Sequence, residues 1–310
     1  MEGAYIFVDF FFILQGYYLI KNVGGGTTEN AYDAAIKYFC SRISRFFPTV
    51  LLSASLMLLL QIVGTNGIKN IVILGSQFLW QISFVSQLFS WISLGAGGLL
   101  WFLSVSVLVG TIVVLLCACF GKKVVIAAMF GCGYLYSRIY AEAGNLDIWW
   151  TEVVKAGIND CMVRALAGIM LGIVAKEVFE FLRKYDYRKW VTLIMRLATF
   201  GATAFALFST VYKPHTDLDF YLVLMFAAII VFANLSFPCV NNRFTDYLDK
   251  LCLPMYAFQV VCIMFVSSFA PVTSVNSVII LALDVAISAI SLKVLSSINI
   301  RKHIILEGER

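Results

Sequence analysis

Charged residues are scarce in this chain, at 13% of 310 positions, whereas soluble domains carry about 25%. Hydrophobic residues make up 61%, and the mean hydropathy is +0.89. Too few polar side chains remain to cover a water-soluble surface, so the composition excludes a soluble fold. The apolar residues form continuous blocks near the length that crosses a bilayer. Because these blocks do not alternate polar and apolar positions, we predict an all-α, polytopic transmembrane helical bundle rather than a barrel.

Histidine is nearly absent, and the cysteines show no metal-binding pattern. The two histidines, His215 and His303, lie in a polar segment and in a basic tail, where we expect solvated side chains. No Cys-x-x-Cys or Cys/His spacing occurs among the eight cysteines, so we predict small apolar fillers and neither a metal site nor disulfides. The net charge of +5 comes from lysines and arginines between apolar blocks, so we expect no nucleic-acid partner.

The apolar blocks predict about nine spans within one domain, 1–310. The predicted spans are 5–20, 49–64, 101–120, 124–140, 163–181, 190–211, 219–237, 253–270 and 277–296. The stretch 71–92 is also apolar, but its glutamines and aromatic residues favour an interfacial or re-entrant segment.

The distribution of positive charge predicts the orientation. With nine spans, about 15 lysines and arginines fall on one side and about five on the other, so the C-terminus is predicted to be cytoplasmic. The connection 21–48 then lies on the cytoplasmic side. Within it, residues 31–47 have helical spacing of apolar side chains among cations, which predicts an amphipathic helix on the inner membrane surface.

Five stretches, taken in order, resemble one family. They are FVDFFFILQGYYLI at 7–20, RISRFFP at 42–48, WFLS at 101–104, RALAGIMLG at 164–172 and PMYAFQ at 254–259. Together they resemble the type-3 membrane acyltransferases (acyltransferase family 3). The resemblance implies a protein of the bacterial cytoplasmic membrane and cell envelope that performs polysaccharide O-acetylation. Such a transferase moves an acyl group, most simply acetyl, from acyl-CoA to a hydroxyl of a surface polysaccharide or glycolipid, with no bound cofactor.

The resemblance also assigns residues. It places acyl-CoA binding at Arg42 and Arg45, and the possible site-lining residues are Gln15, Trp101, Arg164, Tyr256 and Gln259. Two family positions differ here, because a serine is replaced by Gln15 and a late histidine by Gln259. The family's first helix, with its catalytic Arg and His, does not precede the first motif, so we expect a chain without that helix.

Those departures leave other functions open. One alternative is a non-catalytic descendant or truncated member that acts in membrane interaction or glycan handling. A second is a small-molecule transporter, against which no inverted repeat stands out. The catalytic residue is unassigned apart from one weak candidate, Asp9, an ionisable group inside a predicted span. Asp9 could instead be hydrated at the membrane interface.

Several polar residues carry predictions from spacing alone. Arg42 and Arg45 are three residues apart and share a helical face, which suits either phosphate binding or anchoring to the inner leaflet. Gln15 and Gln259 fall at equal predicted depth and could hydrogen-bond across helices. Local helical pairs are predicted for Arg138 with Glu142 and for Arg164 with Asp160, and these outer polar residues could instead line an acceptor path. Asp284 lies inside the last span without a predicted partner.

Overall fold

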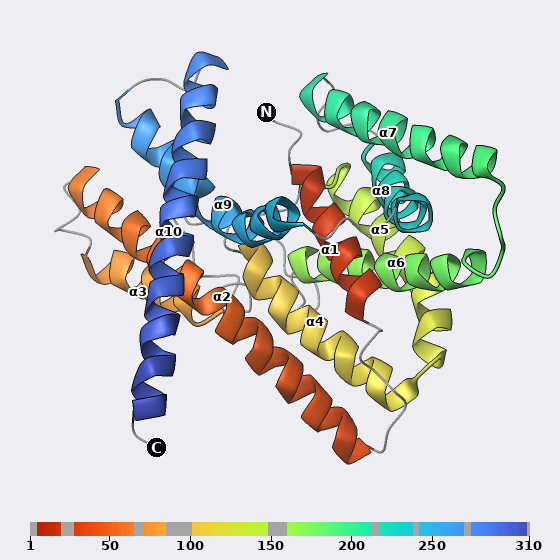
Figure 1. Ribbon diagram of the computed structural model, residues 1–310, viewed down its shortest axis with the longest axis horizontal. Helices are drawn as coiled ribbons and strands as arrows, with labels where there is room; N and C mark the ends of the chain where they lie inside the picture. Colours follow the sequence, from red (N-terminus) through yellow and green to blue (C-terminus); the bar gives the residue numbers. More distant parts are fainter. Residues whose placement is uncertain are drawn as a thin grey trace. The chain divides into compact units, whose positions relative to one another are not determined.

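The computed structural model describes residues 5–19, 28–64, 71–84, 101–147, 160–212, 218–237, 242–269 and 274–308. All regular elements in these ranges are helices (Figure 1). They are α1 (Phe7–Leu19), α2 (Thr28–Gly64), α3 (Ile71–Ile82), α4 (Trp101–Phe120), α5 (Lys123–Ala143), α6 (Asp160–Leu182), α7 (Lys189–Tyr212), α8 (Leu218–Ser236), α9 (Arg243–Ser267) and α10 (Ser274–Gly308). The prediction of an all-α fold is confirmed.

Seven of the described helices are long and apolar enough to cross a membrane, namely α2, α4, α5, α7, α8, α9 and α10. This supports an integral membrane protein. Two predicted spans are not among these seven helices. Helix α1 is too short, with 13 residues, and α6 carries charged residues near both ends. The total of nine spans therefore stays a prediction. The stretch predicted to be interfacial contains only the 12-residue α3, and its remainder, 85–92, lies outside the described residues.

Helix α2 differs from the sequence prediction. A separate surface helix at 31–47 followed by a span from 49 was expected, but one continuous helix runs from Thr28 to Gly64 through Pro48. A proline inside a helix removes one N–H donor, here the one facing the Ser44 carbonyl, yet membrane helices tolerate this where neighbouring groups satisfy the backbone. The outward apolar residues Tyr32 and Ile36 remain exposed, as the amphipathic pattern predicts.

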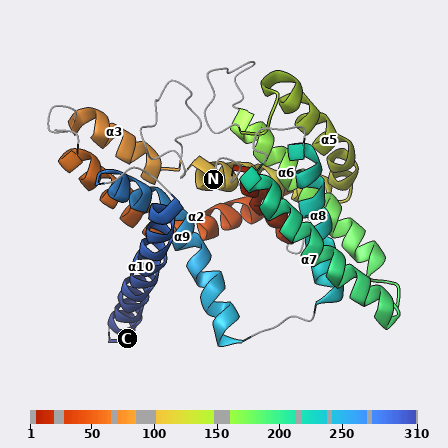
Figure 2. The ribbon, with the colours of Figure 1, turned by 90° about the horizontal axis from the view of Figure 1, so that it is seen from above.

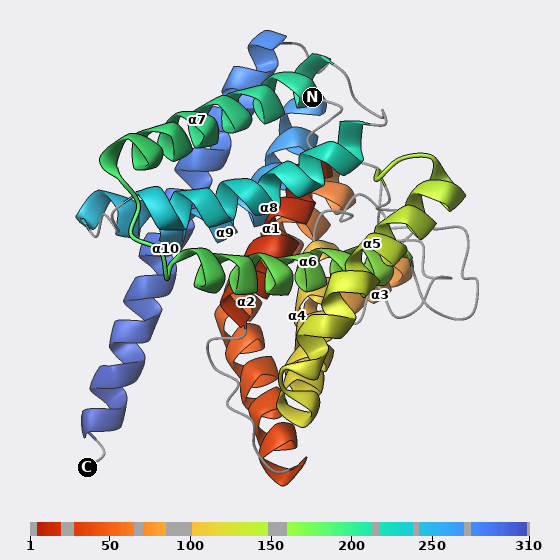
Figure 3. The same ribbon diagram turned by 90° about the vertical axis from the view of Figure 1, so that its right-hand side faces the viewer.

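The helices form two compact units, each described here by itself. Unit 1 comprises 1–41 and 105–239, and unit 2 comprises 42–104 and 240–310. Both units draw on α2 and α4, so neither corresponds to a single stretch of chain. In unit 1, α6 packs against α1, α5 and α8, and α8 also contacts α7 (Figures 2 and 3). In unit 2, α9 packs along α10, and Met57 of α2 joins their apolar core.

The closest helix contact in unit 1 is the one between α1 and α6. A Cβ atom added to Gly16 would overlap the Ile169 carbonyl, and one added to Gly172 would overlap the Ile13 carbonyl. The two backbones therefore touch at positions where only glycine fits. Small residues at such crossings let membrane helices gain dispersion energy without a hydrophobic driving force. This contact fixes the position of the polar α1 residues Asp9 and Gln15.

Candidate functional site

A fully buried ion pair joins α1 to α6. Oδ2 of Asp9 accepts hydrogen bonds from Nε of Arg164, at 3.0 Å, and from Nη2 of the same guanidinium. Oδ1 of Asp9 accepts from the Tyr136 hydroxyl of α5 at 2.8 Å. Neither charged side chain has any exposed surface. Both carboxylate oxygens are thus engaged, and the charge of Asp9 is balanced by one guanidinium.

This geometry corrects two predictions. Asp9 is not hydrated at an interface, because it is completely buried between helices. The carboxylate that Arg164 meets is Asp9, 155 positions away in sequence, rather than the expected local partner Asp160. A lone buried charge costs several kcal/mol of desolvation, and here each of the two charged groups has a partner of opposite charge. The local pair predicted for Arg138 and Glu142 is confirmed, with Nε 3.2 Å from Oε1.

A second buried carboxylate extends the network to α8. The Tyr5 hydroxyl donates to Oδ2 of Asp219 at 2.6 Å, and the Leu146 backbone N–H donates to the same oxygen at 3.3 Å. The Tyr5 carbonyl accepts from Nη2 of Arg164 at 2.8 Å. Asp219 lies in the first turn of α8, where the helix dipole favours a negative charge. Tyr5 therefore connects both carboxylates, and the network ties α1, α5, α6 and α8 together.

Sequence reasoning missed Tyr5, Tyr136 and Asp219 as members of this network. Each lies near an end of a predicted span on the side opposite the positive cluster. That shared depth was the available signal, since hydroxyl donors and carboxylates at equal depth in neighbouring helices can meet. Which helices are neighbours does not follow from depth, so the sequence could not select these three residues.

A second polar cluster in unit 1 surrounds Gln15. Nε2 of Gln15 donates to the Tyr38 hydroxyl and to the Ser106 carbonyl, both at 2.8 Å, while the Ser106 hydroxyl donates to Oε1 at 2.7 Å. A Cβ atom at Gly110 would lie 2.6 Å from the Tyr38 hydroxyl oxygen, so this glycine makes room for the cluster. The predicted bond to Gln259 stays a prediction, because Gln259 belongs to unit 2; within unit 1, Gln15 has the partners just described.

The predicted donor-binding arginines lie on α2, within unit 2. Arg45 is exposed, and its nearest carboxylate, Asp249 of α9, is 4.0 Å away. An exposed pair at that distance contributes at most about 1 kcal/mol, so Arg45 can exchange this partner for another anion. Arg42, one turn earlier, is half-buried. The two arginines are three residues apart within one continuous helix, a spacing that puts their Cα atoms on one side of it.

The other predicted site-lining residues are divided between the two units. Trp101 is buried with its ring against Phe102, and Phe102 packs edge-on against Tyr256 at 5.3 Å between centroids. Trp101 and Tyr256 therefore meet through Phe102 in unit 2. Gln15 and Arg164 belong to unit 1 and lie in different hydrogen-bond networks there.

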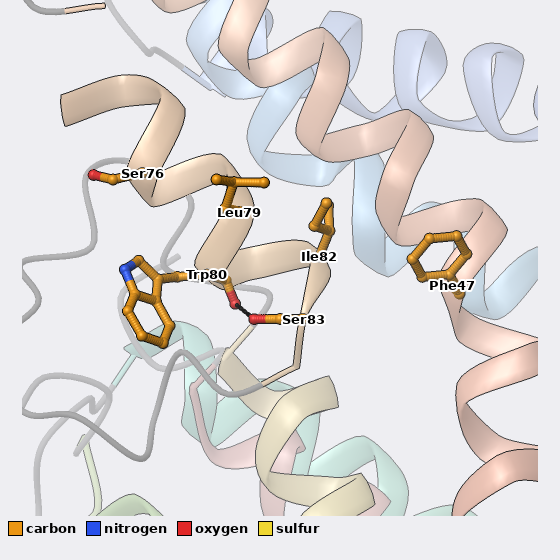
Figure 4. Close-up of a pocket in the computed structure, with 6 residues that line it drawn as sticks. All are labelled: Phe47, Ser76, Leu79, Trp80, Ile82 and Ser83. Atoms are coloured by element: carbon orange, nitrogen blue, oxygen red, sulfur yellow. Dashed lines mark hydrogen bonds between the residues drawn. The ribbon is translucent and has the colours of Figure 1, made fainter. Parts of the chain in front are cut away.

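Unit 2 also has a hollow of about 520 Å³ between α2 and α3. Its lining residues are Phe47, Ser76, Leu79, Trp80, Ile82 and Ser83 (Figure 4). The Ser83 hydroxyl donates to the Trp80 carbonyl at 3.0 Å. Apart from Ser76 and Ser83, the lining side chains are apolar or aromatic, so the walls are mainly apolar. A hollow of this character suits an acyl chain better than a sugar.

Within the described ranges, no group of three His, Cys, Asp or Glu side chains is placed to hold a metal ion. His215 and the His303 side chain lie outside what the structure describes. Comparisons with protein-family profiles, with curated proteins and with solved structures found no match to this chain. The likeness to membrane acyltransferases therefore depends on the motifs quoted above.

Proposed function

We propose that this protein is a membrane O-acyltransferase that moves an acyl group, most simply acetyl, from acyl-CoA to a hydroxyl of a surface polysaccharide or glycolipid. The observation that carries the proposal is the packing of α1 against α6. These helices bear two of the motifs behind the resemblance, and Gly16, Gly172 and the Asp9–Arg164 pair bring them into direct contact. The motifs thus form one packed element of unit 1 rather than unrelated stretches of apolar sequence.

The proposed donor site is the Arg42/Arg45 face of α2. Guanidinium groups match the oxygens of a phosphate in a planar fork, and CoA carries phosphates that stay in the cytosol. Arg45 holds its present carboxylate only loosely, so a phosphate can displace it. The predicted orientation puts this part of α2 on the cytoplasmic side.

Acyl transfer requires a proton acceptor. The sugar hydroxyl oxygen attacks the thioester carbonyl, the C–S bond breaks, and CoA leaves as a thiol after taking up the proton that the hydroxyl loses. Asp9 is poorly suited to relay that proton, because Arg164 and Tyr136 occupy both of its oxygens. Gln15 is an amide and cannot act as a general base.

Because neither Asp9 nor Gln15 is suited to accept the proton, a second candidate is a non-catalytic membrane protein on the same scaffold that handles a glycan or a partner. Mass spectrometry of surface glycans from cells with and without the chain distinguishes the two. Loss of O-acyl groups on deletion, restored by the wild type and not by the Arg42→Ala/Arg45→Ala variant, supports the transferase. Unchanged acylation on deletion favours the non-catalytic protein.

The double replacement Arg42→Ala/Arg45→Ala is expected to weaken acyl-CoA binding at least about 30-fold, because two charge-assisted contacts at roughly 1–1.5 kcal/mol each are lost. Binding of acetyl-CoA to the purified protein in detergent, followed by calorimetry, measures this change. The matched control is Lys122→Ala/Lys123→Ala, which removes two exposed cations on the same predicted side of the membrane. Equal affinity in the wild type and the arginine variant would remove these residues from the donor site.

The exposed thiol of Cys40, two residues before Arg42, reports the side of the membrane directly. In a variant that keeps Cys40 as its only cysteine, a membrane-impermeant maleimide is expected to label inside-out vesicles and not intact cells. The reason is that the positive charges beside Cys40 favour the cytoplasmic side. Labelling of intact cells would place the arginines away from cytosolic acyl-CoA.

A further inference from the structure

Helix α10 buries a polar stripe inside unit 2. Asp284, Ser288 and Ser291 are almost fully buried, at 4%, 0% and 2% exposure. Their spacing puts them on one helical face, whereas the apolar residues around that face are exposed, including Leu281, Val285 and Ile290. The stripe is central within the apolar segment Asn276–Leu295, which is long enough to cross a membrane. This helix therefore turns its carboxyl group inward, away from lipid.

The surroundings of Asp284 offer little to stabilise a negative charge. Among the described residues its hydrogen-bond donor is the Ser288 hydroxyl, at a long 3.5 Å from Oδ1. The titratable group facing it from α9 is the buried thiol of Cys262, which is close enough to interact electrostatically. From α2, the residues that pack beside Ile287 in this core are apolar, among them Leu52 and Leu56.

This carboxyl takes part in no ion pair in the part of the chain that the structure describes. Within the described ranges, no Lys, Arg or His nitrogen lies within 4.0 Å of Asp284, since the ion pairs there involve other carboxylates. Lys293 on the same helix is nine positions further on, or about 14 Å along the axis, and is exposed. The charged residues of α9 all precede Leu251, at the N-terminal end of the helix.

The other two buried carboxyls, Asp9 and Asp219, have partners that stabilise a negative charge. Asp9 has a guanidinium and a phenol, and Asp219 has two donors and a helix N-terminus. Asp284 lies in the interior of its helix with a single long contact. An ionised carboxylate in such a place costs many kcal/mol, and a group in this position takes up a proton instead.

We propose that Asp284 is a proton-binding site within the membrane, and that release of its proton to water opens the seam between α9 and α10. With the proton bound, the carboxyl is neutral, and α9 and α10 pack together without water between them. After release, the carboxylate must be solvated, and the route that we propose for water is the seam between the two helices. This inference does not depend on acyl transfer or on the donor site.

A carbodiimide tests the protonated state, because it reacts with protonated carboxyls in apolar surroundings. Dicyclohexylcarbodiimide is applied to the full chain in liposomes near neutral pH, and peptide mass spectrometry locates the adduct. We expect an adduct at Asp284, and above the titration midpoint its rate should fall about tenfold per pH unit as the acid form is depleted. Asp249→Asn should leave this adduct unchanged, because Asp249 is exposed.

Infrared spectroscopy supplies a second, independent measurement that does not require the reagent to enter. The wild type minus Asp284→Asn difference spectrum should contain the carbonyl band of a protonated carboxyl, and this band should vanish at high pH. The absence of both band and adduct would overturn the proposal. Loss of the adduct in the presence of sodium ions at constant pH would also overturn it, because the ligand would then be a metal cation.

The buried thiol of Cys262 reports on the opening of the seam. Alkylation of Cys262, normalised to the exposed Cys252 in the same helix, should rise with pH more steeply in the wild type than in Asp284→Asn. The asparagine variant controls for the general increase in thiol reactivity with pH. Identical normalised rates in both proteins would show that proton release does not separate α9 from α10.

Discussion

Replacing Asp9 with alanine is expected to destabilise the protein by about 3–5 kcal/mol, because the guanidinium of Arg164 is left buried without its partner. Removal of the carboxylate also takes away the acceptor of the Tyr136 hydroxyl, in a place where water cannot substitute. Thermal or denaturant unfolding in detergent micelles measures the loss. Arg164→Ala should be similarly damaging, since it leaves a buried carboxylate with only a phenol.

The double variant Asp9→Leu/Arg164→Met separates the cost of an unpaired buried charge from the net contribution of the ion pair to the free energy of unfolding. Well-packed apolar residues often replace a buried ion pair at little cost, so we expect this variant to be more stable than either single alanine variant. The exposed pair Arg138–Glu142 is the matched control, and breaking it should cost about 0.5 kcal/mol. Single alanine variants at Asp9 and Arg164 that unfold like the wild type would contradict the buried-pair interpretation.

Adding one methyl group at Gly16 or Gly172 is the second severe change that we expect. In either variant the new Cβ would meet backbone atoms, which no change of side-chain rotamer can relieve. Helices α1 and α6 would have to separate, and this shift would lengthen the Asp9–Arg164 contacts as well. We expect a loss above the roughly 1–3 kcal/mol of ordinary overpacking, with little folded protein recovered by size-exclusion chromatography.

Gly133→Ala and Gly201→Ala are the matched controls for these glycine variants. Both glycines lie within helices, and no atom lies within 4 Å of an added Cβ. Since alanine favours helix over glycine by about 0.8–1 kcal/mol, these variants should be as stable as the wild type or more so. Equal behaviour of Gly16→Ala and Gly201→Ala would show that α1 and α6 are not in backbone contact.

The helices were the predictable part of this fold, because an apolar block of bilayer length has few other structures available in lipid. The predicted span 101–120 coincides with α4, and most of the other predicted spans match helices to within a few residues. Helix α2 was divided wrongly because Pro48 and the change from amphipathic to uniformly apolar sequence both suggested a boundary. Helical hydrogen bonding continues through that point.

Partner choice was the unpredictable part of the candidate site. Helical spacing correctly paired Arg138 with Glu142, because both residues lie on one helix and face solvent. The same rule failed for Arg164, whose partner is set by the glycine contact between α1 and α6. Depth did not select Tyr38 and Ser106, the partners of Gln15 within unit 1, because depth does not say which helices are neighbours. Long-range pairing is decided by close packing, which spacing in one helix does not encode.

Tyr5 has a consequence for how unit 1 can move. Its main chain is held by Arg164 and its phenol by Asp219, so one residue is fastened at two points to two different helices. Sliding α1 along its axis, or rotating it, would break both attachments together. A displacement of α1 within unit 1 is therefore expected to carry α6 and α8 with it. Helix α7 joins this block through α8, where Nε of Arg196 donates to the Ser236 carbonyl, while Leu197 and Phe200 face outward.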